Sequence, residues 1–276
     1  MSDSPDIHIH PTAVVHPDAR IGPGCRIQPH AVIDAHVELG PGCEVGPGAY
    51  LTGHTVLGAR NRIHAGAVLG DSPQDLKYDG APTRLRIGDD NVFREHVTIH
   101  RSSRPDDDTV IGHGNLFMAG CHVGHNSHVG NHNIVANGAL IGGHASLADR
   151  VFLSGNCLVH QFARIGRLAL MQGGSGISRD LPPFCIAKGA NGMAGLNVVG
   201  LRRAGFTPAQ RLELRAAYHR LFRSRLPFAA VLAAVRSEFN HSPVVMELLD
   251  FVATSRRGVC RDTGSRSSPS GPDDAG

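Results

Sequence analysis

Residues 123–150 read VGHNSHVGNHNIVANGALIGGHASLADR, and an aliphatic residue returns at every sixth position of this stretch. The same apolar period runs in one phase from Ile9 to Ile177, interrupted only over residues 70–86 and 100–110. Hexapeptide periods are typical of parallel β-helices, in which three hexapeptides make one triangular coil. An α-helix would spread these residues around its axis, because it turns once every 3.6 residues. We therefore predict a mainly β fold, a parallel β-helix with the repeated apolar side chains inside.

The end of the repeat and its two interruptions predict the domain organisation. The interruptions do not shift the phase of the repeat, so they are expected to be loops that leave the coil corners. Cap and proline signals predict three helices after the repeat, and the first carries an apolar stripe, including Leu212 and Tyr218, that is expected to pack on the end of the solenoid. The predicted parts are an N-terminal tail (1–8), a β-helix (9–190) with loops 70–86 and 100–110, a C-terminal helical domain (191–258) and a disordered tail (259–276). The predicted helices run from Thr207-Pro208 to about Ser224, from Pro227 to Phe239, and from Ser242-Pro243 to about Ser255.

The composition limits the classes of function. The net charge of +3 does not indicate nucleic-acid binding, and no P-loop or dinucleotide fingerprint is present, so any nucleotide is expected to bind without that machinery. No cofactor is implied. The N-terminus lacks a secretory signal and no apolar run could span a membrane, so a cytoplasmic protein without membrane insertion is expected. Because no CxxC pair occurs, the cysteines at small inward positions are predicted to be buried, reduced thiols. These are Cys25, Cys43, Cys121 and Cys157.

Histidines crowd one part of the repeat: the chain has 18, and six of them lie between residues 122 and 160. Residues about 18 apart stack on neighbouring coils, roughly 4.8 Å apart, so His125, Gly143 and Gln161 are predicted to form one column. An imidazole titrates near neutral pH and can act as a general base. Spacing alone leaves three interpretations open: polar corner residues, a zinc site like that of the histidine-ligated carbonic anhydrases, or the base of an acyltransferase.

Six sequence motifs, two of which contain histidines of this cluster that flank the predicted column, occur in a fixed order along the chain. Together they resemble the bacterial acyl-[acyl-carrier-protein]–UDP-N-acetylglucosamine O-acyltransferases, and the resemblance covers residues 9 to about 258. Hexapeptides alone would indicate only a broad superfamily, whereas the combination is much more specific. The strings are GDSPQDLKY (70–78), FREHVTIHR (93–101), CHVGHN (121–126), IGGH (141–144), VHQFARIG (159–166) and GLNVVGLRRAGF (195–206).

The resemblance implies a left-handed parallel β-helix with a C-terminal α-helical cap, assembled as a homotrimer with active sites between subunits. It implies transfer of a 3-hydroxyacyl group from acyl carrier protein to the 3-hydroxyl of UDP-N-acetylglucosamine, the first step of lipid A biosynthesis, with neither cofactor nor metal. A 3-amino acceptor stays open, because a related N-acyltransferase of the pathway shares the solenoid. That enzyme has a large extra N-terminal domain, for which we expect no room in residues 1–8.

Two residues are implied to act on the reacting groups. His125 matches the general base of the family, and Gly143, one coil further, matches the glycine whose N–H supports the developing oxyanion. A second set is implied to contact the substrates. It comprises Asp75 and Lys77 in the first loop, His122, Asn126, His144, His160 and Gln161 near the base, Gly173, whose missing side chain leaves room for a longer acyl chain, and Asn197 and Arg203 near the nucleotide.

Two positions depart from the family pattern. Asn126 stands where the family commonly has an acidic residue, and an amide stabilises an imidazolium less than a carboxylate does. Ala204 replaces a further basic residue, which weakens the expected contacts with the nucleotide. The helical domain is nonetheless rich in arginine and is expected to dock the acidic acyl carrier protein. Its arginines include Arg202, Arg203, Arg211, Arg215, Arg220, Arg223 and Arg225.

Overall fold

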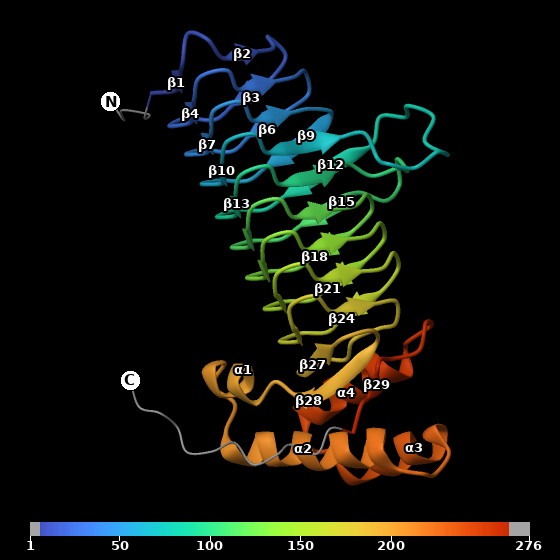
Figure 1. Ribbon diagram of the computed structural model, residues 1–276. Coiled ribbons are helices and arrows are strands. Elements are labelled where there is room, and N and C mark those ends of the chain that lie inside the picture. The colour runs from blue at the N-terminus through green and yellow to red at the C-terminus, as the bar shows by residue number, and fades with distance from the viewer. Residues whose placement is uncertain (1–5, 265–276) are drawn as a thin grey trace.

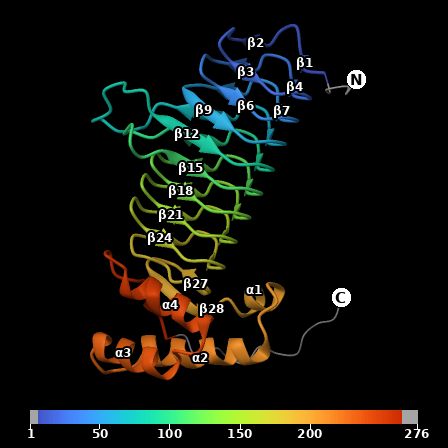
Figure 2. The same ribbon diagram turned by 180° about the vertical axis from the view of Figure 1, so that it is seen from behind.

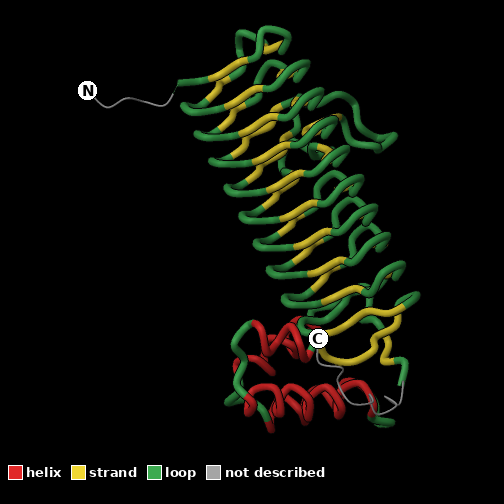
Figure 3. Tube along the Cα trace, turned by 60° about the vertical axis from the view of Figure 1, so that its left-hand side comes forward, coloured by secondary structure: helices red, strands yellow, loops and turns green. Residues whose placement is uncertain are grey.

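The computed structural model describes residues 6–264, and in it three parallel sheets wind into one long prism (Figure 1). Each strand pairs with the strand one coil further along, and most pairs lie 18 residues apart, as His122 does from Leu140. In Figure 3 the short strands form rows along the prism, with the helices gathered at one end. The first sheet consists of β1 (His8–Ile9), β4 (Arg26–Ile27), β7 (Glu44–Val45), β10 (Arg62–Ile63), β13 (Val92–Phe93), β16 (Leu116–Phe117), β19 (Ile134–Val135), β22 (Phe152–Leu153), β25 (Leu170–Met171), β27 (Cys185–Lys188), β28 (Gly192–Leu196) and β29 (Arg261–Asp262).

The other two sheets complete each coil. Only β28 departs from the parallel order, because it returns antiparallel to β27. The second sheet consists of β2 (Val14–Val15), β5 (Val32–Ile33), β8 (Tyr50–Leu51), β11 (Val68–Asp71), β14 (Thr98–His100), β17 (His122–Val123), β20 (Leu140–Ile141), β23 (Leu158–Val159) and β26 (Gly176–Ile177). The third consists of β3 (Arg20–Ile21), β6 (Glu38–Leu39), β9 (His54–Leu57), β12 (Arg84–Ile87), β15 (Thr109–Ile111), β18 (His128–Val129), β21 (Ser146–Leu147) and β24 (Arg164–Ile165).

The apolar residues of the hexapeptide period form the core. Ile27 and Leu51 are fully buried, and the stacked rings of Phe93 and Phe117 lie 5.2 Å apart between centroids. Ile9 stays 43% exposed because its coil has a neighbour on one side only. All six cysteines of the chain are free and buried, and burial raises the pKa of Cys121 to about 12. The predicted inward, reduced thiols are therefore present.

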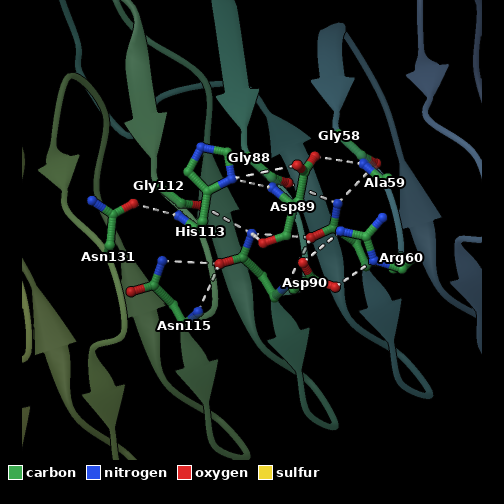
Figure 4. A network of polar contacts seen from close by, with 12 residues as sticks. Gly58, Ala59, Arg60, Gly88, Asp89, Asp90, Gly112, His113, Asn115 and Asn131 are labelled. Atoms are coloured by element: carbon green, nitrogen blue, oxygen red, sulfur yellow. Dashed lines mark hydrogen bonds and ion pairs between the residues drawn. The ribbon is translucent and has the colours of Figure 1, made fainter.

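A ladder of buried asparagines joins the coils where the third sheet passes into the first. Oδ1 of Asn61 accepts from N and Nδ2 of Asn91, and Oδ1 of Asn91 accepts in the same way from Asn115. Figure 4 shows the polar contacts at this corner, where Asp89 accepts from the N–H of Ala59 at 2.7 Å. Each amide satisfies backbone groups that a tight corner would otherwise leave unpaired. These bonds hold successive coils in register.

Four helices close the C-terminal end (Figure 1). Thr207 caps α2 and Pro208 is its first residue, as predicted, and Thr207 also forms a reciprocal capping box with Gln210. Sequence reasoning missed α1, which has only six residues, and misplaced Leu212, which is 67% exposed rather than packed on the solenoid. None of the helices within residues 6–264 is long and apolar enough to cross a membrane. The helices are α1 (Val198–Arg203), α2 (Pro208–Arg223), α3 (Phe228–Glu238) and α4 (Pro243–Ala253).

The bounds of three predicted segments were wrong. The loops predicted at 70–86 and 100–110 are shorter, because β11, β12, β14 and β15 extend into them by pairing with strands of neighbouring coils. They span residues 72–83 and 101–108. The tail predicted from residue 259 is ordered as far as residue 264, because β29 pairs with β28 and Cys260 is buried. The rest of that predicted tail, 265–276, lies outside the described residues.

Candidate active site

One corner of the prism, which we call the loop-bearing corner, lies where the chain passes from the second sheet to the third. His125 lies on it, between β17 and β18. Both loops, 72–83 and 101–108, leave this same corner two coils and one coil earlier, and Figure 2 shows the longer loop projecting from the prism. Gly143 and Gln161 follow His125 at the same place on the next two coils, as predicted from the period.

The hydrogen bonds of Asn126 determine the tautomer of His125. Oδ1 of Asn126 faces the backbone N–H of Ser103 at 3.0 Å, and an N–H can only donate, so this atom is the amide oxygen. The same oxygen lies 2.8 Å from Nδ1 of His125. Nδ1 therefore carries the proton and donates it to Asn126. Nε2 of His125 is left with a free lone pair, which is the form that a general base needs.

Gly143 leaves the space above this nitrogen open. A Cβ at position 143 would lie 2.8 Å from Nε2 of His125, closer than van der Waals contact allows. A Cβ at Gly124 would lie 2.6 Å from the nitrogen of Gly143, so that amide is flanked by two positions without side chains. Within residues 6–264 no acceptor takes up the N–H of Gly143. The corner thus combines a free imidazole nitrogen with a free amide.

Three further imidazoles surround His125. The ring of His144 meets it edge to face, 5.2 Å away between centroids, and stacks on Phe162. His122 bonds Oγ1 of Thr98 through Nδ1 at 2.7 Å. Burial, with the neighbouring imidazoles His100 and His125, lowers the pKa of His122 to about 4, and burial also lowers the pKa of His144. These rings are therefore neutral near pH 7 and add no positive charge beside the base.

Sequence reasoning missed His100, which lies in β14 with its ring edge against His122, 4.8 Å away between centroids. It is 7% exposed, burial lowers its pKa, and its Nδ1 has no hydrogen-bond partner in the described part of the chain. The string FREHVTIHR contains this residue, so its place after the inward Ile99 was the available signal. Burial of the ring could not be foreseen because it depends on neighbouring coils.

An apolar cavity of about 430 Å³ opens beside these imidazoles on the face of the second sheet. His122 and His160 lie at its polar side, and Nδ1 of His160 is 3.0 Å from the carbonyl of Gln161. Leu140 and Leu158 stay about half exposed along it, at 44% and 51%. The cavity continues past Gly176 and Ile177, away from His125 along the axis. It offers apolar surface to a chain-like ligand.

The remaining predicted residues lie farther from His125 in a single chain. Asp75 and Lys77 belong to the projecting loop 72–83, where Oδ1 of Asp75 accepts from the N–H of Lys77. Gly173 is exposed at a different corner, between β25 and β26. Asn197 caps the start of α1 and Arg203 is its last residue, at the helical end of the molecule (Figure 1). Gly173, Asn197 and Arg203 therefore lie on other parts of the chain than His125, whereas Asp75 is close enough to affect the pKa of His144.

The side chain of Asn197 is occupied within the chain. Its Oδ1 accepts from the N–H of Gly200 and so caps α1, and its Nδ2 donates to the carbonyl of Leu168, both at 2.9 Å. Arg203 is exposed, in the last turn of the same helix. Among residues 6–264 no group of three or more His, Cys, Asp or Glu side chains is arranged to hold a metal ion.

Comparisons with known proteins identify the family. A hexapeptide transferase model matches residues 36–71 and 108–143, and the model of domain 2 of UDP-N-acetylglucosamine O-acyltransferases matches residues 180–260. The chain is 47% identical to the acyl-[acyl-carrier-protein]–UDP-N-acetylglucosamine O-acyltransferase of an Anaeromyxobacter species, over 92% of this chain and 99% of that one. It belongs to the UDP-N-acetylglucosamine O-acyltransferase family. The resemblance stated from the six strings is therefore confirmed.

Two solved UDP-N-acetylglucosamine acyltransferases are similar in structure over most of the chain. The enzyme from Arabidopsis aligns with a TM-score of 0.80 at 38% identity, over 92% of this chain and all of that one. The enzyme from Francisella novicida aligns with a TM-score of 0.89 at 32% identity, over 93% and 95% of the two chains. The predicted left-handed β-helix with a helical cap is confirmed.

Proposed function

We propose that this chain transfers a 3-hydroxyacyl group from acyl carrier protein to the 3-hydroxyl of UDP-N-acetylglucosamine, the first step of lipid A biosynthesis. The names of its relatives supply the donor and the acceptor. The observation that carries the proposal is the free Nε2 of His125 beside the free N–H of Gly143. A base and an oxyanion donor on either side of one open space are what direct acyl transfer requires.

The reaction proceeds without an acyl-enzyme. Nε2 of His125 takes the proton of the sugar hydroxyl as its oxygen attacks the thioester carbonyl carbon. The N–H of Gly143 donates to the oxyanion that forms. When the tetrahedral intermediate collapses, the C–S bond breaks and the imidazolium returns its proton to the thiolate of the carrier. The cysteines support a direct transfer, because all of them are buried.

The surrounding residues fit the two substrates. The apolar cavity past Leu140 and Leu158 suits the acyl chain, with His122 and His160 near its polar end. Gly173, further along the solenoid, has no side chain and so leaves room for a longer acyl chain. Asp75 and Lys77 reach from their loop to the sugar in a neighbouring subunit. The remaining contacts are assigned to His144 and Gln161 near the base and to Arg203 at the nucleotide, where a guanidinium meets phosphate oxygens. Asn197 contributes at that end by capping α1, which carries Arg203.

A homotrimer is part of the proposal, because α1 and the loop 72–83 lie far apart in one chain and must meet in the cleft between two. The acidic carrier docks on the arginines of the helical domain. Arg220 pairs with Glu238 and Arg223 with Asp262, whereas Arg211 and Arg215 line a cavity of about 550 Å³ beside Leu212. A KM for the carrier that rises with ionic strength supports this docking, since salt screens exposed charges.

A transfer assay with UDP-N-acetylglucosamine and 3-hydroxyacyl carrier proteins of graded chain length tests the function. The wild type should acylate the sugar nucleotide, and His125→Ala should lower kcat at least about 10²-fold, because positioned proton transfer contributes that much. His16→Ala is the matched control, since His16 lies among the first coils. A His125→Ala variant with wild-type kcat would refute the proposal.

Two further arms of the assay separate the alternatives. A UDP-sugar with a 3-amino group in place of the 3-hydroxyl tests the N-acyltransferase alternative, which predicts higher kcat/KM for the amine. A chelator and a zinc measurement test the metal lyase alternative, which predicts stoichiometric zinc and carbonic anhydrase activity that the chelator abolishes. The proposed function predicts O-acylation that the chelator does not change.

A further inference from the structure

A carboxylate from the second loop lies behind Asn126. Nδ2 of Asn126 donates to the backbone carbonyl of Asp107 at 2.7 Å and lies 3.2 Å from its carboxylate oxygen Oδ2. On its other side, Oδ1 of Asn126 accepts from Nδ1 of His125. An unbroken chain of hydrogen bonds therefore runs from the imidazole through the amide to Asp107. Such chains polarise one another in a protein interior.

Burial and several hydrogen bonds fix the position of Asn126. It is 3% exposed, its N–H donates to Oγ1 of Thr109 at 2.7 Å, and its Oδ1 also accepts from N and Oγ of Ser103. Both Ser103 and Asp107 belong to the loop 101–108. The amide therefore has a single orientation, with its oxygen toward His125 and its nitrogen toward Asp107.

Among the described charged groups, Asp107 is the one that hydrogen bonds link to His125, through Asn126, whereas Asp71 acts on His100. Oδ1 of Asp107 lies 3.3 Å from Nε2 of His128, and its Oδ2 lies 3.9 Å from Nδ1 of His144. Burial lowers the pKa of each of the imidazoles His100, His122 and His144, so these rings are neutral near pH 7. Arg104 and Asp75 also act on His144, with opposite signs.

We propose that Asp107 is a positioning residue that takes over, through Asn126, the part an acidic residue at position 126 would play. It holds the amide so that Nδ1 of His125 keeps its proton, and its negative charge stabilises the imidazolium formed when the base takes the sugar proton. The negative charge thus acts on His125 through one intervening side chain, that of Asn126, instead of from position 126 itself. It comes from the loop 101–108 rather than from the coil. This inference rests on the proposed role of His125.

Asp107→Asn removes the charge and keeps the backbone carbonyl that Asn126 bonds. We expect kcat to fall about three- to tenfold, and the acidic limb of the kcat/KM profile to move to lower pH by about half a unit, because the imidazolium loses its counter-charge. KM for UDP-N-acetylglucosamine should stay within about twofold. The matched control is Asp106→Asn, an exposed residue of the same loop, which should leave kcat and profile unchanged.

A charge swap separates this role from simple loop support. Asn126→Asp alone places two carboxylates side by side, and their repulsion should lower the melting temperature and the activity. The double variant Asn126→Asp, Asp107→Asn moves the negative charge next to His125 and should restore kcat. It should also return the acidic limb of the kcat/KM profile to the wild-type pH or to a higher pH. Failure of the swap to restore them, or an Asp107→Asn profile equal to that of Asp106→Asn, would overturn the inference.

The two proposals fail in different ways. If His125→Ala is inactive but Asp107→Asn behaves like its control, only the role of Asp107 is wrong. If His125→Ala keeps full activity, the base itself is wrong, and the role of Asp107 falls with it.

Discussion

Asn126, His144 and Phe162 take the same place on three successive coils of the loop-bearing corner. Each has a positive φ, between 57° and 65°. Asn and His tolerate this left-handed conformation better than most residues, whereas Phe does so at a cost. The ring of Phe162 stacks on His144 with centroids 4.7 Å apart, which offsets part of that cost. At Asn126 and His144 the corner thereby carries polar side chains at a backbone position that few residues accept.

Gly143→Ala should abolish most transfer without unfolding the protein. The backbone of Gly143 does not lie in the left-handed region, so alanine is allowed there, but its Cβ would lie 2.8 Å from Nε2 of His125. We expect kcat/KM to fall about 10²-fold or more, because the reacting atoms lose this space. In Gly155→Ala the new Cβ would meet only the carbonyl of Asn137 at 3.6 Å, so this control should keep both activity and melting temperature. An active Gly143→Ala variant would contradict the assignment of Gly143 to the active site.

Acid should destabilise the fold partly through His122. Its pKa is lowered from 6.5 to about 4 in the folded protein, so the unfolded chain binds more protons between these two values. The free energy of unfolding contributed by this group is therefore complete above pH 6.5 and is lost as the pH falls toward 4. In His122→Gln the free energy of unfolding from urea titrations should depend less steeply on pH across this window. An unchanged slope would show that His122 is not a neutral, desolvated group.

The coils are held together both by short strands and by the asparagine ladder at their corner. Two-residue strands contribute few hydrogen bonds each, so the side chains between them matter for register. The extension of β11 to Asp71 and of β12 back to Arg84 anchors the loop 72–83 at both ends. The loop 101–108, which carries Asp107, is anchored in the same way by β14 and β15.

Asn91→Ala should cost about 2–4 kcal/mol of unfolding free energy, because it leaves buried partners of the ladder unpaired. Asn91 is fully buried, and it accepts from N and Nδ2 of Asn115 while its Nδ2 donates to Oδ1 of Asn61. Arg60→Ala at the same corner removes an exposed ion pair with Asp90 and should cost far less. Chemical denaturation of the two variants measures the difference, and equal losses would argue against the ladder.

The outer faces of the prism differ in character along its C-terminal half. Ile134 and Phe152 on the first sheet and Leu140 and Leu158 on the second are exposed, whereas the third sheet presents His128, Ser146 and Arg164. Two apolar faces and one polar face suit a threefold assembly, in which the first sheet of one chain meets the second sheet of the next.

Light scattering should therefore give a mass three times the 29.2 kDa of one chain. Phe152→Glu should shift the protein toward monomer and reduce transfer, because a charge buried in the interface has no partner. Val56→Glu is the matched control: Val56 is exposed to a similar degree, 38% against 36%, but lies on the third sheet. A monomeric wild type with full activity would contradict the shared active site.

The amino-acid sequence alone determined the solenoid, the cap and the family, because a strict period of six allows one way to bury the apolar residues and the strings around His125 are specific. Stacking at intervals of 18 also predicted the column of His125, Gly143 and Gln161. Loop bounds and the order of residues 259–264 depended on pairing between coils, which the period does not encode.

Only the folded molecule brought together groups from different coils and loops. His100 lies against His122 across neighbouring coils, and Asp107 reaches Asn126 across 19 positions of chain. Each contact depends on the path of a loop or on burial by an adjacent coil, so no local sequence pattern predicts it. The free nitrogen of His125 is likewise a property of that packing, because the loop 101–108 orients the amide that holds its tautomer.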